Sequence, residues 1–182
     1  MLSPEIRRSL LKLARESILA GFGHAKPALP DIPELREKRG VFVTLHKNGE
    51  LRGCIGYIRA YNSLAESVAQ MARSAAFSDP RFAPVRENEL PNLRIEISVL
   101  SELEPVEDVS EILIGRDGLL LDHPLGSGVF LPQVPVEWNW DLQTYLVQLC
   151  RKAGVHKRAW EDNEALLYRF TAEVFAESDI LA

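Results

Sequence analysis

Length, composition and charge already exclude several classes of protein. The chain has 182 residues, of which 46% are hydrophobic and 26% charged, with a formal net charge of −5. This is the composition of an ordinary globular domain with its own core, so a disordered or collagen-like chain is excluded. The acidic excess disfavours general nucleic-acid binding, because it repels polyanions. We predict a single domain over residues 1–182.

The two cysteines, Cys54 and Cys150, indicate a reducing compartment. They lie far apart, without a CxxC pair or clustered histidines, so neither a disulfide framework nor a metal site is predicted. The start of the chain lacks the features of a signal peptide, and no stretch approaches the roughly 18 apolar residues of a membrane span. We therefore expect a cytoplasmic protein that needs no membrane, metal or cofactor.

The first half of the chain predicts a helix, a hairpin and a second helix. Helical spacing of apolar residues indicates a helix over 4–20, and the prolines that follow suit an extended connection over 23–33. Asn48-Gly49 is the strongest short signal for a hairpin, here over 41–58. A capping box then begins a helix over 64–77.

The second half predicts mostly strands. Alternating side chains indicate a strand over 94–100, two short strands over 118–121 and 129–131 that pair, and one long strand over 166–177. A helix capped by Asp141 precedes the long strand. Hairpins with helices at irregular intervals predict an α+β fold, an antiparallel sheet with flanking helices, rather than a parallel doubly wound sheet.

The stretch from Leu51 to Gly56, LRGCIG, is the most unusual in the chain. Two glycines inside a β-forming run indicate that another part of the chain packs closely against it. In a regular strand, Arg52 and Cys54 share a face about 6–7 Å apart, where the guanidinium could favour a thiolate. Cys54 is therefore either an activated nucleophile or, as free cysteines more often are, a small buried core residue.

A thiol enzyme also needs a base, and the sequence offers only isolated candidates. The four histidines occur singly, with His46 in the same hairpin as Cys54. Glu137 and Asp141 could form a carboxylate pair for acid–base work, although helix capping alone explains Asp141.

The LRGCIG hexapeptide resembles the signature of the AMMECR family, whose members occur in archaea, bacteria and eukaryotes. The likeness runs from about Leu10 to Phe175. Six further blocks match in order: GVFVTL (40–45), SDPRFAPV (78–85), IEISVL (95–100), GRDGLLL (115–121), FLPQVPVEWNWD (130–141) and LCRKAG (149–154).

The resemblance implies a larger and a smaller subdomain with a cleft between them near the signature. Seven residues match polar positions of the family's motifs and are expected to line that cleft, Cys54 and Glu137 as candidate catalytic groups and the others as ligand-binding groups: Arg52, Cys54, Asp79, Arg81, Gln133, Glu137 and Asp141. In many prokaryotes, members are encoded with, or fused to, a Memo-like protein and a radical SAM protein, so the resemblance implies a shared modification or metabolic pathway.

Two functions follow from these observations. The first is an accessory module that binds a small polar ligand or a partner protein and acts with Memo-like and radical SAM proteins. The second is a thiol-dependent enzyme in which Cys54 attacks an electrophilic carbon, Arg52 lowers the thiol pKa or holds a carboxylate, and Glu137 or a histidine moves protons. RNA binding ranks below both, because the chain has no basic stripe.

Overall fold

The chain folds into two compact units. The computed structural model of the protein describes residues 1–179. Residues 1–100, together with the described residues from 173 onward, form one unit, and residues 101–172 form the other. We call them the large unit and the small unit, and they correspond to the larger and smaller subdomains that the resemblance implies. None of the described helices is long and apolar enough to cross a membrane.

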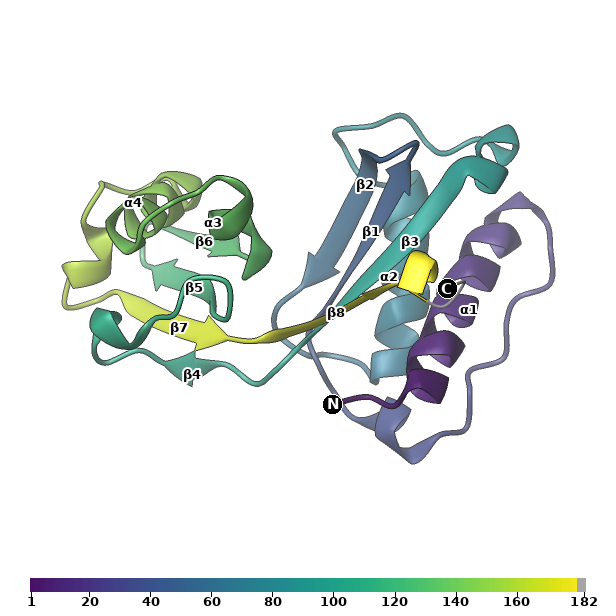
Figure 1. Cartoon of the computed structure of the whole chain (residues 1–182), viewed down its shortest axis with the longest axis horizontal. Helices are drawn as coiled ribbons and strands as arrows, with labels where there is room; N and C mark the ends of the chain where they lie inside the picture. Colours follow the sequence, from purple (N-terminus) through teal and green to yellow (C-terminus); the bar gives the residue numbers. More distant parts are fainter. Residues whose placement is uncertain (180–182) are drawn as a thin grey trace. The chain divides into compact units, whose positions relative to one another are not determined.

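The large unit is a four-stranded sheet with two helices over one face (Figure 1). The strand order is β2-β1-β3-β8, and β1 pairs antiparallel with both β2 and β3. α1 and α2 pack against each other and against the sheet, so that Val43, Leu45 and Ile97 are fully buried beneath them. Its elements are α1 (Pro4–Leu19), β1 (Val41–Lys47), β2 (Glu50–Tyr57), α2 (Leu64–Phe77), β3 (Leu93–Leu100) and β8 (Ala172–Ala176), with short 3-10 helices at Ala20–Phe22, Pro33–Arg36, Glu87–Asn92 and Glu177–Asp179.

Local signals set the first half of this unit, as predicted. Asn48 and Gly49 adopt φ angles of 53° and 85°, which close the hairpin between β1 and β2. The capping box is present at the start of α2, where Ser63 and Glu66 satisfy each other's backbone N–H groups. The predicted hairpin and both helices are therefore confirmed.

The small unit has its own four-stranded antiparallel sheet, in the order β4-β7-β5-β6, with α4 against β5 and β6 (Figure 1). Its core includes the fully buried Leu119, Tyr145 and Leu149. Its elements are β4 (Glu104–Pro105), β5 (Gly118–His123), β6 (Gly126–Phe130), α3 (Gln133–Glu137), α4 (Leu142–Ala153) and β7 (Leu166–Phe170), with 3-10 helices at Val109–Glu111 and Ala159–Glu161.

One predicted element is wrong. The long strand over 166–177 is two strands interrupted at Thr171, and they belong to different sheets: β7 to the small unit and β8 to the large unit. The alternation of side chains continues through the interruption, and alternation alone does not record which sheet a strand joins.

The strand predicted over 94–100 is present, but Ser98 on its polar face is buried, only 1% exposed.

Candidate functional site

The two glycines of the signature strand are explained by close packing within the large unit. A Cβ atom at Gly53 would lie 2.2 Å from the backbone oxygen of Ala75 in α2. A Cβ atom at Gly56 would lie 2.4 Å from both the Phe42 ring and the backbone oxygen of Val41. The prediction that something packs against this strand is therefore confirmed.

A β-bulge determines what faces the thiol. Counting outward from the hairpin turn pairs Thr44 with Gly53, but the register shifts by one residue between Leu45 and His46, so that Thr44 lies opposite Cys54. The Thr44 hydroxyl donates a hydrogen bond of 3.2 Å to Cys54 Sγ. Thr44 was not predicted as a site residue, because no sequence signal marked the bulge.

The environment of Cys54 keeps its thiol protonated. Burial is the largest influence and raises the pKa of the thiol; the hydrogen bond from Thr44 and the charge of Arg81 lower it by less. Arg81, rather than Arg52, is thus the arginine whose charge acts on the sulfur. The residue is neither fully buried nor fully exposed. The thiol is therefore not an activated thiolate.

Asp79 and Arg81 hold the backbone of Cys54 at the edge of the sheet. β2 is an edge strand, and the Cys54 N–H donates to Asp79 Oδ2 at 2.9 Å while Arg81 Nη2 donates to the Cys54 carbonyl at 3.1 Å. Arg81 also donates to both oxygens of Asp79, at 3.0 and 2.7 Å. These hydrogen bonds from Arg81 hold the pKa of the buried Asp79 carboxyl well below its usual range. We call Cys54, Asp79 and Arg81 the signature edge.

Arg52 is engaged by a buried carboxylate that sequence reasoning missed. Its Nε and Nη2 donate to the two oxygens of Glu89 at 3.1 and 3.0 Å, and its Nη1 donates to the Ala83 carbonyl at 3.0 Å. Lys47 Nζ donates to the same carboxylate at 2.7 Å. The hydrogen bonds from Arg52 and Lys47 lower the pKa of Glu89 from 4.5 to about 2. No short-range pattern marks this contact, because Arg52 and Glu89 are 37 residues apart.

A pocket of about 300 Å³ opens beside Arg52. It lies within the large unit, next to the hairpin turn and the start of the 3-10 helix Glu87–Asn92. Its lining residues are Lys47, Arg52, Ala83, Pro84, Arg86, Asn88 and Glu89.

The remaining predicted residues lie in the small unit. Gln133 and Glu137 are the first and last residues of α3, the former half-buried and the latter exposed. Asp141 caps α4, its Oδ1 accepting the Thr144 N–H at 2.7 Å. The side chain of Thr144 and then its backbone N–H lower the pKa of this carboxyl. The structure thus brings Arg52, Cys54, Asp79 and Arg81 together in one unit and the other three in the second. That all seven line one cleft stays a prediction.

The charges of two carboxylates, Asp79 and Glu96, act on the Cys54 thiol and raise its pKa, but no histidine is among its hydrogen-bond partners within residues 1–179. None of the histidines in residues 1–179 forms a hydrogen bond with Cys54 Sγ; His123 and His156 instead contact Asp162, at 3.2 and 2.7 Å. In the same range, no three His, Cys, Asp or Glu side chains are grouped so that they could hold a metal ion.

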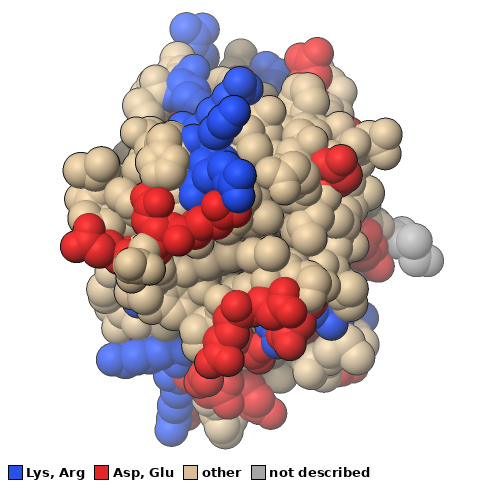
Figure 2. All heavy atoms as spheres, turned by 90° about the vertical axis from the view of Figure 1, so that its left-hand side faces the viewer, with Lys and Arg blue, Asp and Glu red and all other residues tan. Residues whose placement is uncertain are grey.

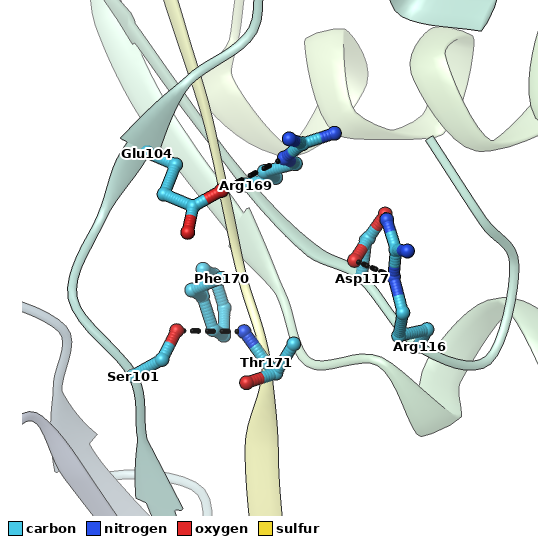
Figure 3. Close-up of a pocket in the computed structure, with 7 residues that line it drawn as sticks. All are labelled: Ser101, Glu104, Arg116, Asp117, Arg169, Phe170 and Thr171. Atoms are coloured by element: carbon cyan, nitrogen blue, oxygen red, sulfur yellow. Dashed lines mark hydrogen bonds and ion pairs between the residues drawn. The ribbon is translucent and has the colours of Figure 1, made fainter. Parts of the chain in front are cut away.

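The small unit contains a second polar pocket, of about 270 Å³ (Figure 3). Arg116 donates to both oxygens of the buried Asp117 at 2.7 and 2.6 Å, and Arg169 donates to Glu104 at 3.1 Å. Each arginine of the lining is therefore paired with a carboxylate of the same lining. These ion pairs account for the charged side chains of the lining, and the pocket has no excess of positive or negative charge.

Charges on the surface are grouped by sign. On the face drawn in Figure 2, Lys and Arg side chains form a band in the upper part of the view and a further group at the lower left, and groups of Asp and Glu side chains separate the two. This face therefore offers no continuous basic surface of the kind that follows a nucleic-acid backbone.

Comparisons with known proteins agree with this fold. The family model described as AMMECR1 matches residues 11–175. Protein TK0174 of Thermococcus kodakarensis is 45% identical over 181 residues, covering 92% of this chain and 88% of the relative. A protein of Methanothermobacter thermautotrophicus is 42% identical over 185 residues, covering 97% of this chain and 96% of the relative.

The crystal structure of uncharacterized protein PH0010 from Pyrococcus horikoshii matches with a TM-score of 0.86 at 41% identity, covering 92% of this chain and 89% of that one, which confirms the α+β fold. The chain therefore belongs to the AMMECR1 family.

Proposed function

We propose that this protein is a non-catalytic module that binds a small polar ligand or a partner protein at the signature edge. In this proposal it acts together with a Memo-like protein and a radical SAM protein. The module contributes recognition, and its partners carry the chemistry.

The observation that carries this proposal is the state of the Cys54 thiol. Burial raises the pKa of the thiol, and no histidine among residues 1–179 is hydrogen-bonded to the sulfur. A thiol nucleophile needs a low pKa or a histidine that accepts its proton, so these two features together argue against covalent catalysis.

The geometry of Arg81 supports a role in recognition. Its side chain is 55% exposed, whereas the Asp79 side chain that holds it is 2% exposed. A guanidinium fixed by a buried carboxylate loses little conformational entropy when it binds, which makes it a preorganised anchor for a carboxylate or carbonyl group.

The state of the thiol is tested by measuring the rate of Cys54 alkylation as a function of pH. A Cys150→Ala background removes labelling of the second cysteine. We expect slow labelling of the folded protein up to an apparent pKa above the unperturbed value of about 8.5, because burial disfavours the thiolate. Rapid labelling of the folded protein at near-neutral pH would instead favour the thiol-dependent enzyme.

The partnership is tested by co-purification with a Memo-like protein and a radical SAM protein. We expect Arg81→Gln to weaken retention of a partner, because it removes the exposed anchor. Arg73→Gln is the matched control, since Arg73 is an exposed arginine on α2 outside the signature edge. Equal retention by wild-type protein and both variants would exclude the signature edge as the partner's binding site.

A further inference from the structure

We infer that the pocket lined by Lys47, Arg52, Arg86 and Asn88 binds a small oxyanion, a phosphate or carboxylate group. We call it the hairpin pocket. It shares no residue with the signature edge, so the two assignments can fail independently.

Glu89 holds two cations, Lys47 and Arg52, at the hairpin pocket. Its Oε1 accepts the Arg86 backbone N–H at 2.9 Å and Arg52 Nη2 at 3.0 Å, and its Oε2 accepts Lys47 Nζ at 2.7 Å and Arg52 Nε at 3.1 Å. Four donors occupy the carboxylate, whose side chain is only 11% exposed. The carboxylate is therefore turned toward its donors and offsets their mutual repulsion.

The hairpin pocket carries a local excess of positive charge. The lining contains three cationic side chains and one carboxylate, in a chain whose net charge is −5. The low pKa of Glu89, about 2, keeps this carboxylate ionised at neutral pH, and the excess remains positive. A concave surface with an excess of one sign concentrates the opposite charge.

Arg86 adds a third cation to the lining of the hairpin pocket. It is exposed, and its guanidinium has no carboxylate partner among residues 1–179. Stabilisation of Glu89 explains Lys47 and Arg52, but it does not explain a third cation at the same pocket. A planar guanidinium beside an ammonium is the donor pair that proteins use for phosphate and carboxylate oxygens.

The size of the pocket limits the ligand. Its volume of about 300 Å³ lies at the lower end of the range for small-molecule sites, which begins near 300 Å³. The pocket therefore suits a compact group rather than a polymer, and the acidic chain as a whole repels extended polyanions.

The test is a titration of the full chain, followed by ¹⁵N–¹H NMR, with inorganic phosphate and with acetate, each against sodium chloride at the same ionic strength. We expect saturable shifts of the backbone amides of residues 86–89 and of Lys47 with at least one of the two oxyanions and not with chloride. Saturation with phosphate alone assigns a phosphate group, with acetate alone a carboxylate, and with both a general oxyanion site.

Matched variants separate recognition from folding. Arg86→Gln should weaken binding about tenfold, the loss of one charge-assisted contact, without changing the melting temperature. Arg73→Gln removes the same charge from an exposed site on α2 and should leave the affinity unchanged. Chemical shifts that do not saturate would overturn the inference, and so would equal shifts with chloride or unchanged binding by Arg86→Gln. Cys54 alkylation does not depend on this outcome, so it tests the proposed function separately.

Discussion

A single carboxylate, Glu89, links the hairpin turn to the segment that follows α2. It is 9% exposed and accepts hydrogen bonds from Lys47 and Arg52, which lie on β1 and β2. Because its pKa is lower in the folded chain than in the unfolded chain, its contribution to stability depends on pH.

The sign of this dependence follows from the direction of the shift. A carboxyl whose pKa falls from 4.5 to about 2 on folding contributes its full stabilisation above about pH 5 and loses it as the pH falls toward 2. We expect Glu89→Gln to lower the free energy of unfolding near pH 7 by on the order of 3 kcal/mol, and the difference from wild type to shrink as the pH falls.

Urea denaturation at a series of pH values measures this difference. Glu87→Gln is the control, because Glu87 is an exposed carboxylate two residues away. A difference between Glu89→Gln and wild type that stays constant from pH 7 to about pH 3 would show that the ion pairs of Glu89 contribute nothing.

The segment that follows α2 covers the edge of the signature strand. Asp79 and Arg81 bond to the backbone of Cys54, and the Phe82 ring lies 6.0 Å from the Arg52 guanidinium and 5.5 Å from that of Arg81. The motifs LRGCIG and SDPRFAPV, which are separate in the sequence, therefore contact each other in the folded chain.

We expect Asp79→Asn to loosen this edge. The substitution weakens the acceptor of the Cys54 N–H and removes the charge that holds Arg81, so the Cys54 amide should exchange with solvent faster. Hydrogen exchange followed by NMR measures this, with the amide of Ile97 in the central strand β3 as the internal control. Unchanged protection of Cys54 would show that the strand keeps its edge without the carboxylate.

Elements with local signals were predictable, and contacts between distant segments were not. The capping box at Ser63 and the turn at Asn48-Gly49 are encoded within a few residues, so α2 and the hairpin follow from the sequence. The pairing of Arg52 with Glu89 and the bulge that aligns Thr44 with Cys54 depend on tertiary packing. Likewise, the family motifs predicted Asp79 and Arg81 as site residues, but they did not predict that both side chains are hydrogen-bonded to the Cys54 backbone.

The small unit is an insertion between two strands of the large unit, β3 and β8. The chain leaves the large unit after Leu100 and returns at Glu173. Ser101 and Thr171 lie side by side, since the Ser101 N–H donates to the Thr171 carbonyl and the Thr171 N–H to Ser101 Oγ, both at 2.9 Å. Continuity of the large unit therefore requires only a short connection at this point.

We expect residues 101–172 to fold when expressed alone, because their sheet and core are complete within the unit. Dispersed amide signals and a cooperative thermal transition would establish this. Replacing 101–172 by an Asn-Gly turn tests the reciprocal expectation, that the large unit keeps its own transition. Loss of cooperative unfolding in the isolated piece would mean that its core needs the rest of the chain.

The carboxylate and guanidinium beside Cys54 also have a consequence for solubility. The outer edge of a sheet is a template for another chain, and here its N–H and carbonyl are already occupied at the centre of the strand. A variant that lacks Asp79 would uncover them next to an apolar isoleucine, Ile55. We therefore expect this variant to self-associate into β-rich fibres at high protein concentration. In the wild-type protein, Asp79 and Arg81 prevent this association by occupying the backbone groups of the edge strand.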